Sequence, residues 1–292
     1  MKIGICLPYM KRDLNRSTFT DWCRVIDQGP FHSLSCGERI TGYSLEMRNI
    51  LAFAAARTER VRIVPALYVL PMHSAVQAAK EIATLDILSE GRVTLTVGVG
   101  GREKDYQALG ADMRGRFQRM DEQVALMKQV WRGEQIDDFD EIGPTPVQVG
   151  GPPIMVGAMG PKSISRVAKW ADGLYGFAMD GDPALINHFF TSADRAWADA
   201  GRDTKPYRMG GFWYSLAENS AAALQDYVFD YLKIFGEDEA RKVAQGMVMH
   251  DPGAILAGIA AIEELGCDEL QLVPATGSIA EVEGLADLLS RR

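Results

Sequence analysis

The chain contains few cysteines and histidines, the residues that most often staple small domains or hold metal ions. Its four cysteines are spread along the sequence without a C-x-x-C pair: Cys6, Cys23, Cys36 and Cys267. This spacing favours reduced thiols in a reducing compartment over a disulfide framework or a zinc site. The four histidines form no H-E-x-x-H motif and no other spacing that brings two ligands onto one face: His32, His73, His188 and His250. We therefore expect no metal site.

Positive charge and long apolar runs are also scarce. The 31 lysines and arginines are outnumbered by 39 aspartates and glutamates, which leaves a formal net charge of −8. An acidic surface disfavours nucleic acid and anionic membranes as partners. No apolar run reaches the roughly 18 residues that a membrane span needs, and the apolar stretch near the start is too short for a secretory signal. We expect a cytoplasmic protein.

Segments with the composition of buried strands alternate with segments of helical periodicity along all 292 residues. The sequence predicts strands at residues 2–8, 33–37, 61–69, 92–97, 154–156, 173–177, 208–216 and 269–273. It predicts helices near residues 19–27, 47–54, 74–88, 117–131, 163–171, 183–200, 220–235 and 254–265, and a last helix after residue 278. Pro65 indicates a bulge or irregular turn near the end of the third strand.

Strands separated by helices form parallel sheets with right-handed crossovers, which leaves a doubly wound sheet or a closed barrel. About eight strand–helix units in this length favour the (β/α)8 TIM barrel, which usually takes roughly 250 residues plus insertions. We therefore predict a single α/β domain over residues 1–292. Its loop insertions are the longest irregular stretches, residues 98–116, 133–153 and 237–251.

Two glycine-rich turns follow predicted strands, at the end of the barrel where active sites are built. The first, Gly98–Gly101, is no dinucleotide fingerprint, because Glu103 stands where a glycine is required. This turn is either an ordinary tight turn that needs glycine or a place where the backbone approaches a ligand. The second is Gly157-Ala158-Met159-Gly160, with Pro161 in position for a first helical turn. Its small residues and the helix start suit an anion, and a tight strand–helix turn is the alternative.

Glu38 and Arg39 follow the second predicted strand, where side chains point into the mouth of the barrel. As neighbours of opposite charge they are typical of a solvated or structural ion pair. In a site, Arg39 orients an anionic or carbonyl group, while Glu38 accepts a proton or fixes Arg39. His73 lies after the third strand and either reaches the mouth or caps the next helix.

The chain has no G-x-S-x-G motif, so nothing indicates a serine hydrolase.

The segment Ala55–Gly110 carries the elements R-T-x-R, L-P, A-K-x-x-A-T-L-D-x-L-S-x-G-R and G-V-G in this order. Together with the N-terminal GICLP, the glutamate after the second strand, and residues 152–175 and 266–274, it resembles the luciferase-like monooxygenase superfamily. These are (β/α)8 proteins that bind FMN or the deazaflavin coenzyme F420. The resemblance covers almost the whole chain, and its most specific part is Asp86–Arg92 combined with the turn at Gly98.

The resemblance implies a flavin-type cofactor across the C-terminal mouth of the barrel. It implies that the cofactor phosphate lies against Gly157, Ala158, Met159 and Gly160. It also implies that residues ending the third and fourth strands flank the ring: Ala66, Leu67, Thr96 and Gly98. A bulge or a non-prolyl cis peptide within Pro65-Ala66-Leu67 and a homodimeric assembly follow from the same resemblance.

One departure from the family pattern bears on the reaction. Luciferase-type members carry glutamate–histidine after the second strand, where this chain has Glu38-Arg39. The absence of this histidine disfavours oxygen activation and leaves hydride transfer as the expected type of reaction. The segments resemble most the F420-dependent oxidoreductase branch of the family, which implies an F420-dependent oxidoreductase acting on a small organic molecule. In it, Arg39 stabilises negative charge or holds an anionic substrate and Glu38 orients Arg39, with Glu103 and His73 as secondary candidates for proton transfer.

Two alternatives remain open at this point. One is an FMN-dependent monooxygenase on the same barrel, because the ring contacts that separate the two cofactors are not visible in the sequence. The other is a non-catalytic flavin-binding protein, which would bind the cofactor without turnover.

Overall fold

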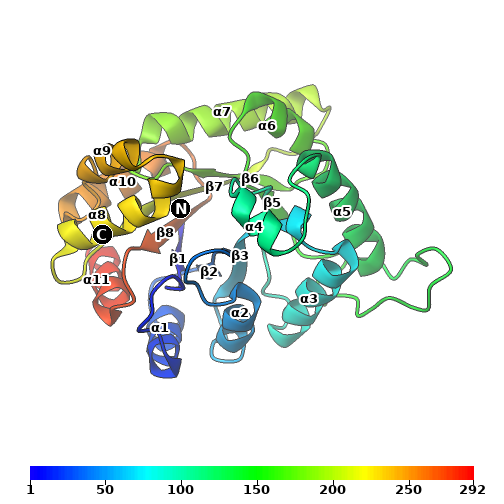
Figure 1. The fold of residues 1–292 in the computed structure, drawn as a ribbon, viewed down its shortest axis with the longest axis horizontal. Helices are drawn as coiled ribbons and strands as arrows, with labels where there is room; N and C mark the ends of the chain where they lie inside the picture. Colours follow the sequence, from blue (N-terminus) through cyan, green and yellow to red (C-terminus); the bar gives the residue numbers. More distant parts are fainter.

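The computed structural model describes residues 1–292 and shows eight parallel strands closed into a barrel in chain order (Figure 1). The strands are β1 Lys2–Cys6, β2 Ser33–Cys36, β3 Arg62–Tyr68, β4 Leu95–Val97, β5 Ile154–Val156, β6 Gly173–Phe177, β7 Tyr207–Tyr214 and β8 Glu269–Pro274. Pairing of β1 with β8 closes the sheet, with Ile3 opposite Leu270. The prediction of a (β/α)8 barrel is confirmed.

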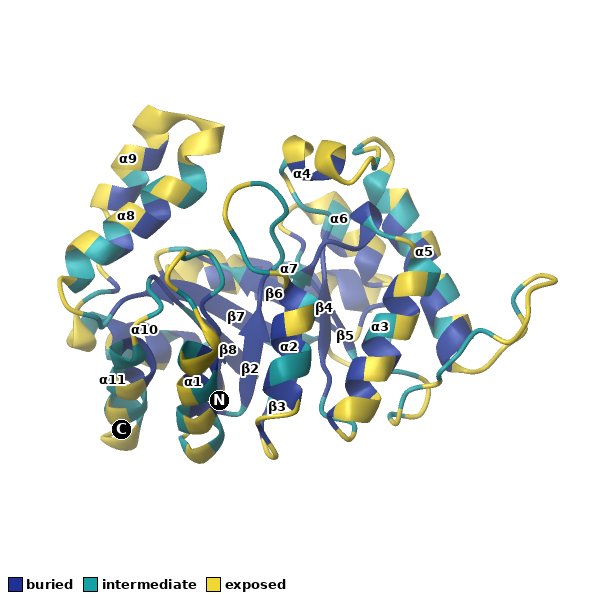
Figure 2. Cartoon of the chain, turned by 60° about the horizontal axis from the view of Figure 1, so that its bottom comes forward, coloured by how far each residue is buried: buried dark blue, intermediate teal, exposed yellow.

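Helices between the strands form an outer ring whose inner faces are buried and whose outer faces are exposed (Figure 2). They are α1 Arg16–Gln28, α2 Met47–Ala55, α3 Ala75–Leu88, α4 Glu103–Ala108, α5 Arg116–Trp131, α6 Pro161–Val167, α7 Pro183–Asp199, α8 Ser220–Leu232, α9 Glu237–Gln245, α10 Pro252–Glu264 and α11 Ile279–Ser290. Two short 3-10 turns accompany them, η1 Leu70–Met72 and η2 Lys233–Phe235. No helix combines the length and the apolar character that a membrane crossing requires.

Two helices lie inside stretches that the sequence predicted to be irregular. α4 has only six residues, and α9 is mostly charged, with Ala240 and Ala244 as its buried residues. Neither has the broad apolar stripe by which a core-facing helix is recognised. α6 also begins and ends earlier than expected, because Pro161 occupies its first turn, where no N–H is needed. α4 and the α8–α9 pair stand on the side of the barrel where the strands end (Figure 2).

The interior of the barrel is polar near its N-terminal end. Glu269 is buried and accepts hydrogen bonds from Tyr207 Oη at 3.0 Å and from Gln271 Nε2 at 2.7 Å, and the Ser33 hydroxyl also donates to it. Gly4 leaves the space for this network, since a Cβ there would lie 2.2 Å from Gln271 Nε2. Buried polar groups need such partners, and these side chains fill this end of the barrel.

Two arginines at the N-terminal end of the barrel bind carbonyl groups of neighbouring loops, and we call them the arginine clamps (Arg60 and Arg92). Arg92 donates five hydrogen bonds of 2.8–3.1 Å, to Ser89 O, Thr58 Oγ1, Val61 O, Ala55 O and Thr58 O. Arg60 donates to the carbonyls of Ile26, Asp27, Gly29 and Phe31. Both belong to the R-T-x-R and L-S-x-G-R elements. Both motif elements therefore have a structural role in this chain.

Candidate active site

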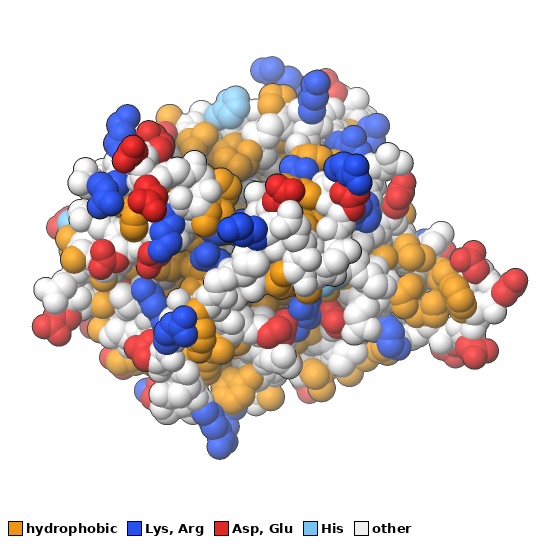
Figure 3. All heavy atoms as spheres, viewed as in Figure 1, with side chains coloured by type: hydrophobic (Ala, Val, Ile, Leu, Met, Phe, Trp, Pro, Cys, Tyr) orange, Lys and Arg blue, Asp and Glu red, His pale blue; other side chains and the backbone are white.

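A cavity of about 320 Å³ opens where the strands end, and every strand or the loop after it contributes to the lining. In (β/α)8 barrels this is the end at which active sites lie. Lys and Arg side chains lie beside hydrophobic ones near the middle of this face (Figure 3). The lining combines small and aliphatic residues at the end of β3 and after β5 with aromatic residues from several other elements.

The end of β3 forms one wall. The peptide bond between Ala66 and Leu67 is cis, and the register between β3 and β4 shifts there. The irregularity expected within Pro65-Ala66-Leu67 is confirmed. Both Ala66 and Leu67 line the cavity. The Leu67 side chain covers the ends of β4 and β5, since a Cβ on Gly98 or Gly157 would lie 2.9 or 2.8 Å from it.

The turn after β5 presents backbone N–H groups without partners. Gly157 N–H belongs to the sheet and donates to Val97 O at 2.9 Å. The N–H groups of Ala158 and Met159 donate to no atom of the chain. Gly160 faces open space, with nothing within 4 Å of a Cβ added to it. The turn can therefore accept an anion through Ala158 and Met159, whereas Gly157 serves the sheet and accommodates Leu67.

Two residues expected beside the cofactor ring lie behind the cavity wall. Thr96 is fully buried in β4 opposite Ala66, and its Oγ1 has no hydrogen-bond partner. Gly98 lies under Leu67 and donates its N–H to Tyr68 O at 3.0 Å. Neither lines the cavity. The structure separates them from it because Leu67 covers the end of β4.

Glu38 lines the cavity and is held by three donors, none of which is Arg39. Its carboxylate accepts hydrogen bonds from Val69 N–H at 2.8 Å, His73 Nε2 at 2.8 Å and Arg48 Nη1 at 3.1 Å. The Glu38 side chain is only 3% exposed. The expectation that Glu38 orients Arg39 is therefore corrected, because Arg48 at the start of α2 takes the place of Arg39. Glu38 instead joins the loops that follow β2 and β3.

His73 does not line the cavity. Its ring contacts Glu38, lies 3.4 Å from Arg48 Nη1, and stands edge-on to Tyr68 with the ring centroids 5.1 Å apart. Ser74, rather than His73, caps the N-terminus of α3. His73 therefore supports Glu38, and the structure gives it no direct contact with a ligand in the cavity.

Arg39 lines the cavity without a carboxylate partner. Its Nε donates to Thr41 O at 2.8 Å, and its Nη1 lies 3.6 Å from Met10 Sδ. Because these contacts leave donors of the guanidinium unused, Arg39 can bind an acceptor that enters the cavity.

The start of α4 brings Asp105, rather than Glu103, to the cavity. Glu103 is exposed and accepts a hydrogen bond from Gln107 Nε2 at 3.3 Å. Asp105 is buried and accepts from the Thr41 N–H at 2.8 Å and from the Thr41 hydroxyl. It thereby ties α4 to the loop that carries Arg39. Glu103 and Asp105 form an acidic pair in the first turn of α4, which is typical of a helix start. This signal was missed because the segment was predicted to be an irregular loop.

Aromatic residues that no motif indicated also line the cavity: Tyr9, Tyr175, Phe177, Trp213, Tyr227, Tyr231 and Phe235. The Trp213 ring has three aromatic neighbours with centroids 5.0–5.6 Å away: Phe177, Tyr227 and Tyr231. We call these four residues the aromatic wall. Burial raises the pKa of Tyr9, Tyr175 and Tyr227 well above the usual value of a phenol. These phenols are therefore neutral at physiological pH and can donate hydrogen bonds.

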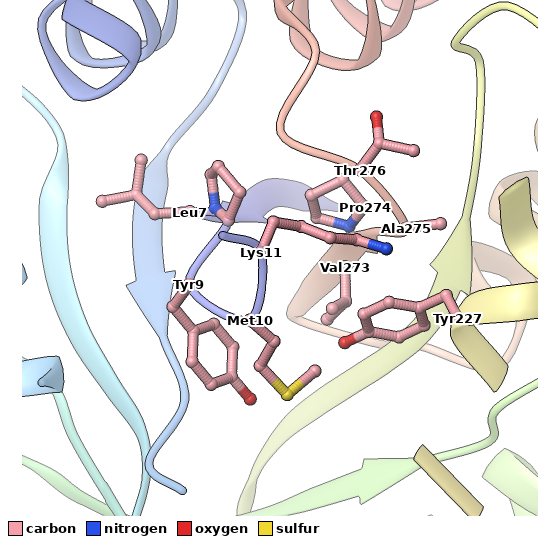
Figure 4. A pocket seen from close by; sticks show the side chains of 10 residues that line it. Leu7, Tyr9, Met10, Lys11, Tyr227, Val273, Pro274, Ala275 and Thr276 are labelled. Carbon is pink, nitrogen blue, oxygen red and sulfur yellow. The ribbon is translucent and has the colours of Figure 1, made fainter. Parts of the chain in front are cut away.

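A narrow crevice of about 10 Å³ lies beside the cavity, between the ends of β1 and β8 (Figure 4). It shares Tyr9, Tyr227 and Val273 with the cavity. Lys11 lies over the Tyr227 ring, with Nζ 5.8 Å from the ring centroid. A space of this size admits about one water molecule, so the crevice belongs to the rim of the cavity.

The four cysteines are expected to be unreactive in the native protein. All are free and buried, and burial raises the pKa of Cys6, Cys23 and Cys267 to about 12 and also raises that of Cys36. Below a raised pKa the thiol keeps its proton, and the thiolate is the reactive form. At about pH 8, Ellman's reagent should modify no thiol of the native chain and all of them after unfolding. Rapid modification of a native thiol would contradict this burial.

The sequence matches the family described as luciferase-like monooxygenase over residues 1–271. The chain belongs to this family. The match runs from β1 into β8, so it takes in nearly the whole barrel.

Relatives within this luciferase-like group carry different cofactor names. The chain is 33% identical over 165 residues to an uncharacterized protein of Mycobacterium tuberculosis, covering 53% of this chain and 57% of that one. It is 33% identical over 133 residues to an F420-dependent hydroxymycolic acid dehydrogenase of the same organism, covering 43% and 36%. It is 29% identical over 153 residues to the oxygenase component of a flavin-dependent trigonelline monooxygenase of Acinetobacter baylyi, covering 48% and 42%. The chain thus spans about half the length of the curated relatives it matches, or less.

Solved structures of other proteins share the fold. A monooxygenase from Streptomyces bottropensis superimposes with a TM-score of 0.77 at 22% identity, covering 100% of this chain and 98% of that one. An F420-dependent secondary alcohol dehydrogenase, in complex with an F420–acetone adduct, gives a TM-score of 0.76 at 17% identity and covers 98% and 97%. At these identities the likeness concerns the barrel alone.

Proposed function

We propose that this luciferase-like protein is an F420-dependent oxidoreductase that transfers a hydride between the deazaflavin and a small organic substrate. The observation that carries the proposal is the composition of the cavity at the ends of the strands. Arg39 lines it with unused donors, and no histidine lines it. An arginine suits the stabilisation of negative charge on a substrate oxygen. The F420-dependent relative supports this choice, and the flavin-dependent one supports FMN as the alternative.

The cavity has the chemistry that such a cofactor needs. Leu67 and Ala66 give an apolar wall for a planar ring, and the N–H groups of Ala158 and Met159 are available to a phosphate. When bound, the deazaflavin would supply the carbon that gives or accepts the hydride.

The protein's own contribution is orientation, exclusion of water and polar contacts to the substrate. The aromatic wall excludes water from one side of the cavity. Arg39 and the neutral phenols of Tyr9 and Tyr227 provide donors for a substrate oxygen, because burial keeps those phenols protonated. Three protein donors occupy most of the acceptor positions of Glu38, so its role is to position the two loops that it joins.

Titration of the purified apoprotein with F420 and with FMN, followed by fluorescence quenching, tests the cofactor. We expect tighter binding of F420, and a change in F420 absorbance with at least one member of a panel of alcohols, aldehydes and enones. Preferential binding of FMN with oxygenation of a substrate under air would replace this proposal by the monooxygenase. Binding of either cofactor without turnover across the panel would favour a non-catalytic binding protein.

The Gly160→Val variant should weaken cofactor binding without unfolding the chain. Gly160 has φ −97° and ψ 150°, which valine adopts readily, and its Cβ would meet no protein atom within 4 Å. We expect about a ten-fold higher Kd for the phosphorylated cofactor, measured in the same titration. Gly157→Val is not a clean test, because its Cβ would lie 2.8 Å from Leu67.

Arg114→Met is the control for Gly160→Val. The Arg114 side chain is 91% exposed and does not line the cavity, so the cofactor Kd should stay within error. An unchanged Kd in the well-folded Gly160→Val variant would remove the phosphate assignment.

The proposal also includes a homodimeric assembly, as the family resemblance implies. Light scattering of the purified chain measures its mass in solution and tests this part independently of the reaction.

A further inference from the structure

Two arginines face the cavity from neighbouring loops. Arg102 is the residue before α4, and its Nη2 donates to Tyr231 O at 2.7 Å. The guanidinium carbon of Arg102 lies 4.9 Å from the centroid of the Tyr231 ring, and that of Arg39 lies 6.0 Å from the same centroid. Both arginines line the cavity. The Tyr231 ring therefore has a cation close to it from the loop after β2 and another from the loop after β4.

Neither arginine forms an ion pair with a carboxylate of the chain. Arg39 and Arg102 donate only to the carbonyls of Thr41 and Tyr231, apart from the sulfur contact of Arg39. Of the acidic residues in the lining, Glu38 pairs with Arg48, and Asp105 accepts hydrogen bonds from Thr41 and acts on Arg102 only through space. Burial, and then the charge of Arg39, lower the pKa of Arg102. Two guanidinium groups that lie near the same ring, neither of them in an ion pair, form a site for an anion.

The surface next to these arginines is flat and aromatic. Tyr231 belongs to the aromatic wall, in which Tyr227 and Tyr231 are stacked with their centroids 6.4 Å apart and Trp213 meets both rings edge-on. These residues come from β7 and α8, whereas the Ala66–Leu67 and Ala158–Met159 segments belong to β3 and to the turn after β5. An apolar or aromatic body is stabilised against such a surface by burial and ring contacts.

We propose that the substrate is an organic anion with an aromatic body, whose carboxylate or similar group binds Arg39 and Arg102 and whose ring lies against Trp213. This inference rests on the proposed function, because it assigns the small-residue side of the cavity to the cofactor and the aromatic side to the substrate. Arg102 thereby becomes a residue that determines specificity. An anion bound to Arg39 and Arg102 can belong either to the substrate or to a charged part of the cofactor. The experiments below distinguish these two sources.

The test uses naphthoate and its neutral isostere naphthamide as probes, with binding to the full chain measured by calorimetry in the absence and presence of F420. We expect naphthoate to bind about ten-fold or more tightly than naphthamide, with a preference that decreases as salt is raised. Arg39→Met and Arg102→Met should each remove most of this preference while leaving naphthamide affinity unchanged. Trp213→Leu should weaken both probes alike, and Tyr231→Leu repeats that test if Trp213→Leu does not fold.

Arg114→Met is the matched control, because the Arg114 side chain is 91% exposed and pairs with Asp112 away from the cavity. It should leave both probes unaffected. Equal binding of naphthoate and naphthamide to the unmodified chain, or an undiminished preference in both cavity arginine variants, would overturn the inference.

Titration of the same variants with F420 and FMN separates the two sources of the anion. Unchanged cofactor affinity together with lost naphthoate preference supports the substrate assignment. Weakened cofactor binding with intact naphthoate preference would assign the arginines to the cofactor and overturn it. Because the probes report binding and the F420 absorbance assay reports turnover, failure of the hydride-transfer proposal and failure of this inference are distinguishable.

Discussion

Replacement of Arg92 by methionine is expected to lower the free energy of unfolding by about 3 kcal/mol. Methionine keeps the length of the aliphatic stem but removes all five hydrogen bonds of the Arg92 guanidinium. Four of the five acceptors are backbone carbonyls, and each that stays buried without a partner costs roughly 1 kcal/mol or more. Since a globular domain has a stability of about 5–15 kcal/mol, this loss is a large part of the total.

Urea unfolding followed by circular dichroism measures this effect as a lower midpoint. Arg92→Lys should recover only a small part of the loss, because an ammonium group cannot reach acceptors on several sides at once. The exposed Arg114→Met variant should unfold at the same urea concentration as the unmodified chain. A midpoint for Arg92→Met equal to that of Arg114→Met would show that the clamp contributes little.

Replacement of Glu38 by alanine is expected to lower kcat/KM about 100-fold for whichever substrate the chain accepts. The Glu38 carboxylate holds Val69, His73 and Arg48 together. Its removal frees the loop that carries Arg39 from the segment after Ala66 and Leu67. A small displacement of either segment changes how the substrate and the cofactor are oriented toward each other. Because the reacting atoms must be close together, such displacements have large effects on the rate.

Glu38→Gln is the milder variant and should fall between Glu38→Ala and the unmodified chain. A glutamine oxygen still accepts the Val69 N–H, while its amide cannot balance the charge of Arg48. Steady-state kinetics with the F420 absorbance assay would measure both variants, and circular dichroism would verify that they fold. If Glu38→Ala retained full kcat/KM, Glu38 would not position these loops.

The barrel was predictable because the signal for each strand is local. Residues 154–156 and 173–177 were predicted with the bounds that the structure has for β5 and β6, since buried parallel strands are short apolar runs between turn residues. α9 was not predictable in the same way. Its face toward the molecule consists of small residues such as Ala240 and Ala244, which give little contrast with a charged loop.

The site was predictable only where a residue ends a strand or follows it within a few positions. Arg39, Ala66, Leu67, Ala158 and Met159 reach the cavity, because strand ends in a barrel meet at one mouth. The partners within the site were not predictable, since they depend on side-chain directions between distant segments. Glu38 bonds to Arg48 on the next helix, and Arg102 meets Tyr231 across 129 residues of sequence.

The arginine clamps act at the closed end of the barrel, far along the strands from the mouth. Because all but one of their acceptors are backbone carbonyls, most positions of the segments that they hold can vary in sequence without loosening the scaffold. Loops at the mouth can then be exchanged with those of relatives while the clamps stay untouched. Because the clamps and the mouth loops lie at opposite ends of the barrel, new specificities can be obtained by recombining the mouth loops. Arg60 and Arg92 are the positions that such engineering should leave unchanged.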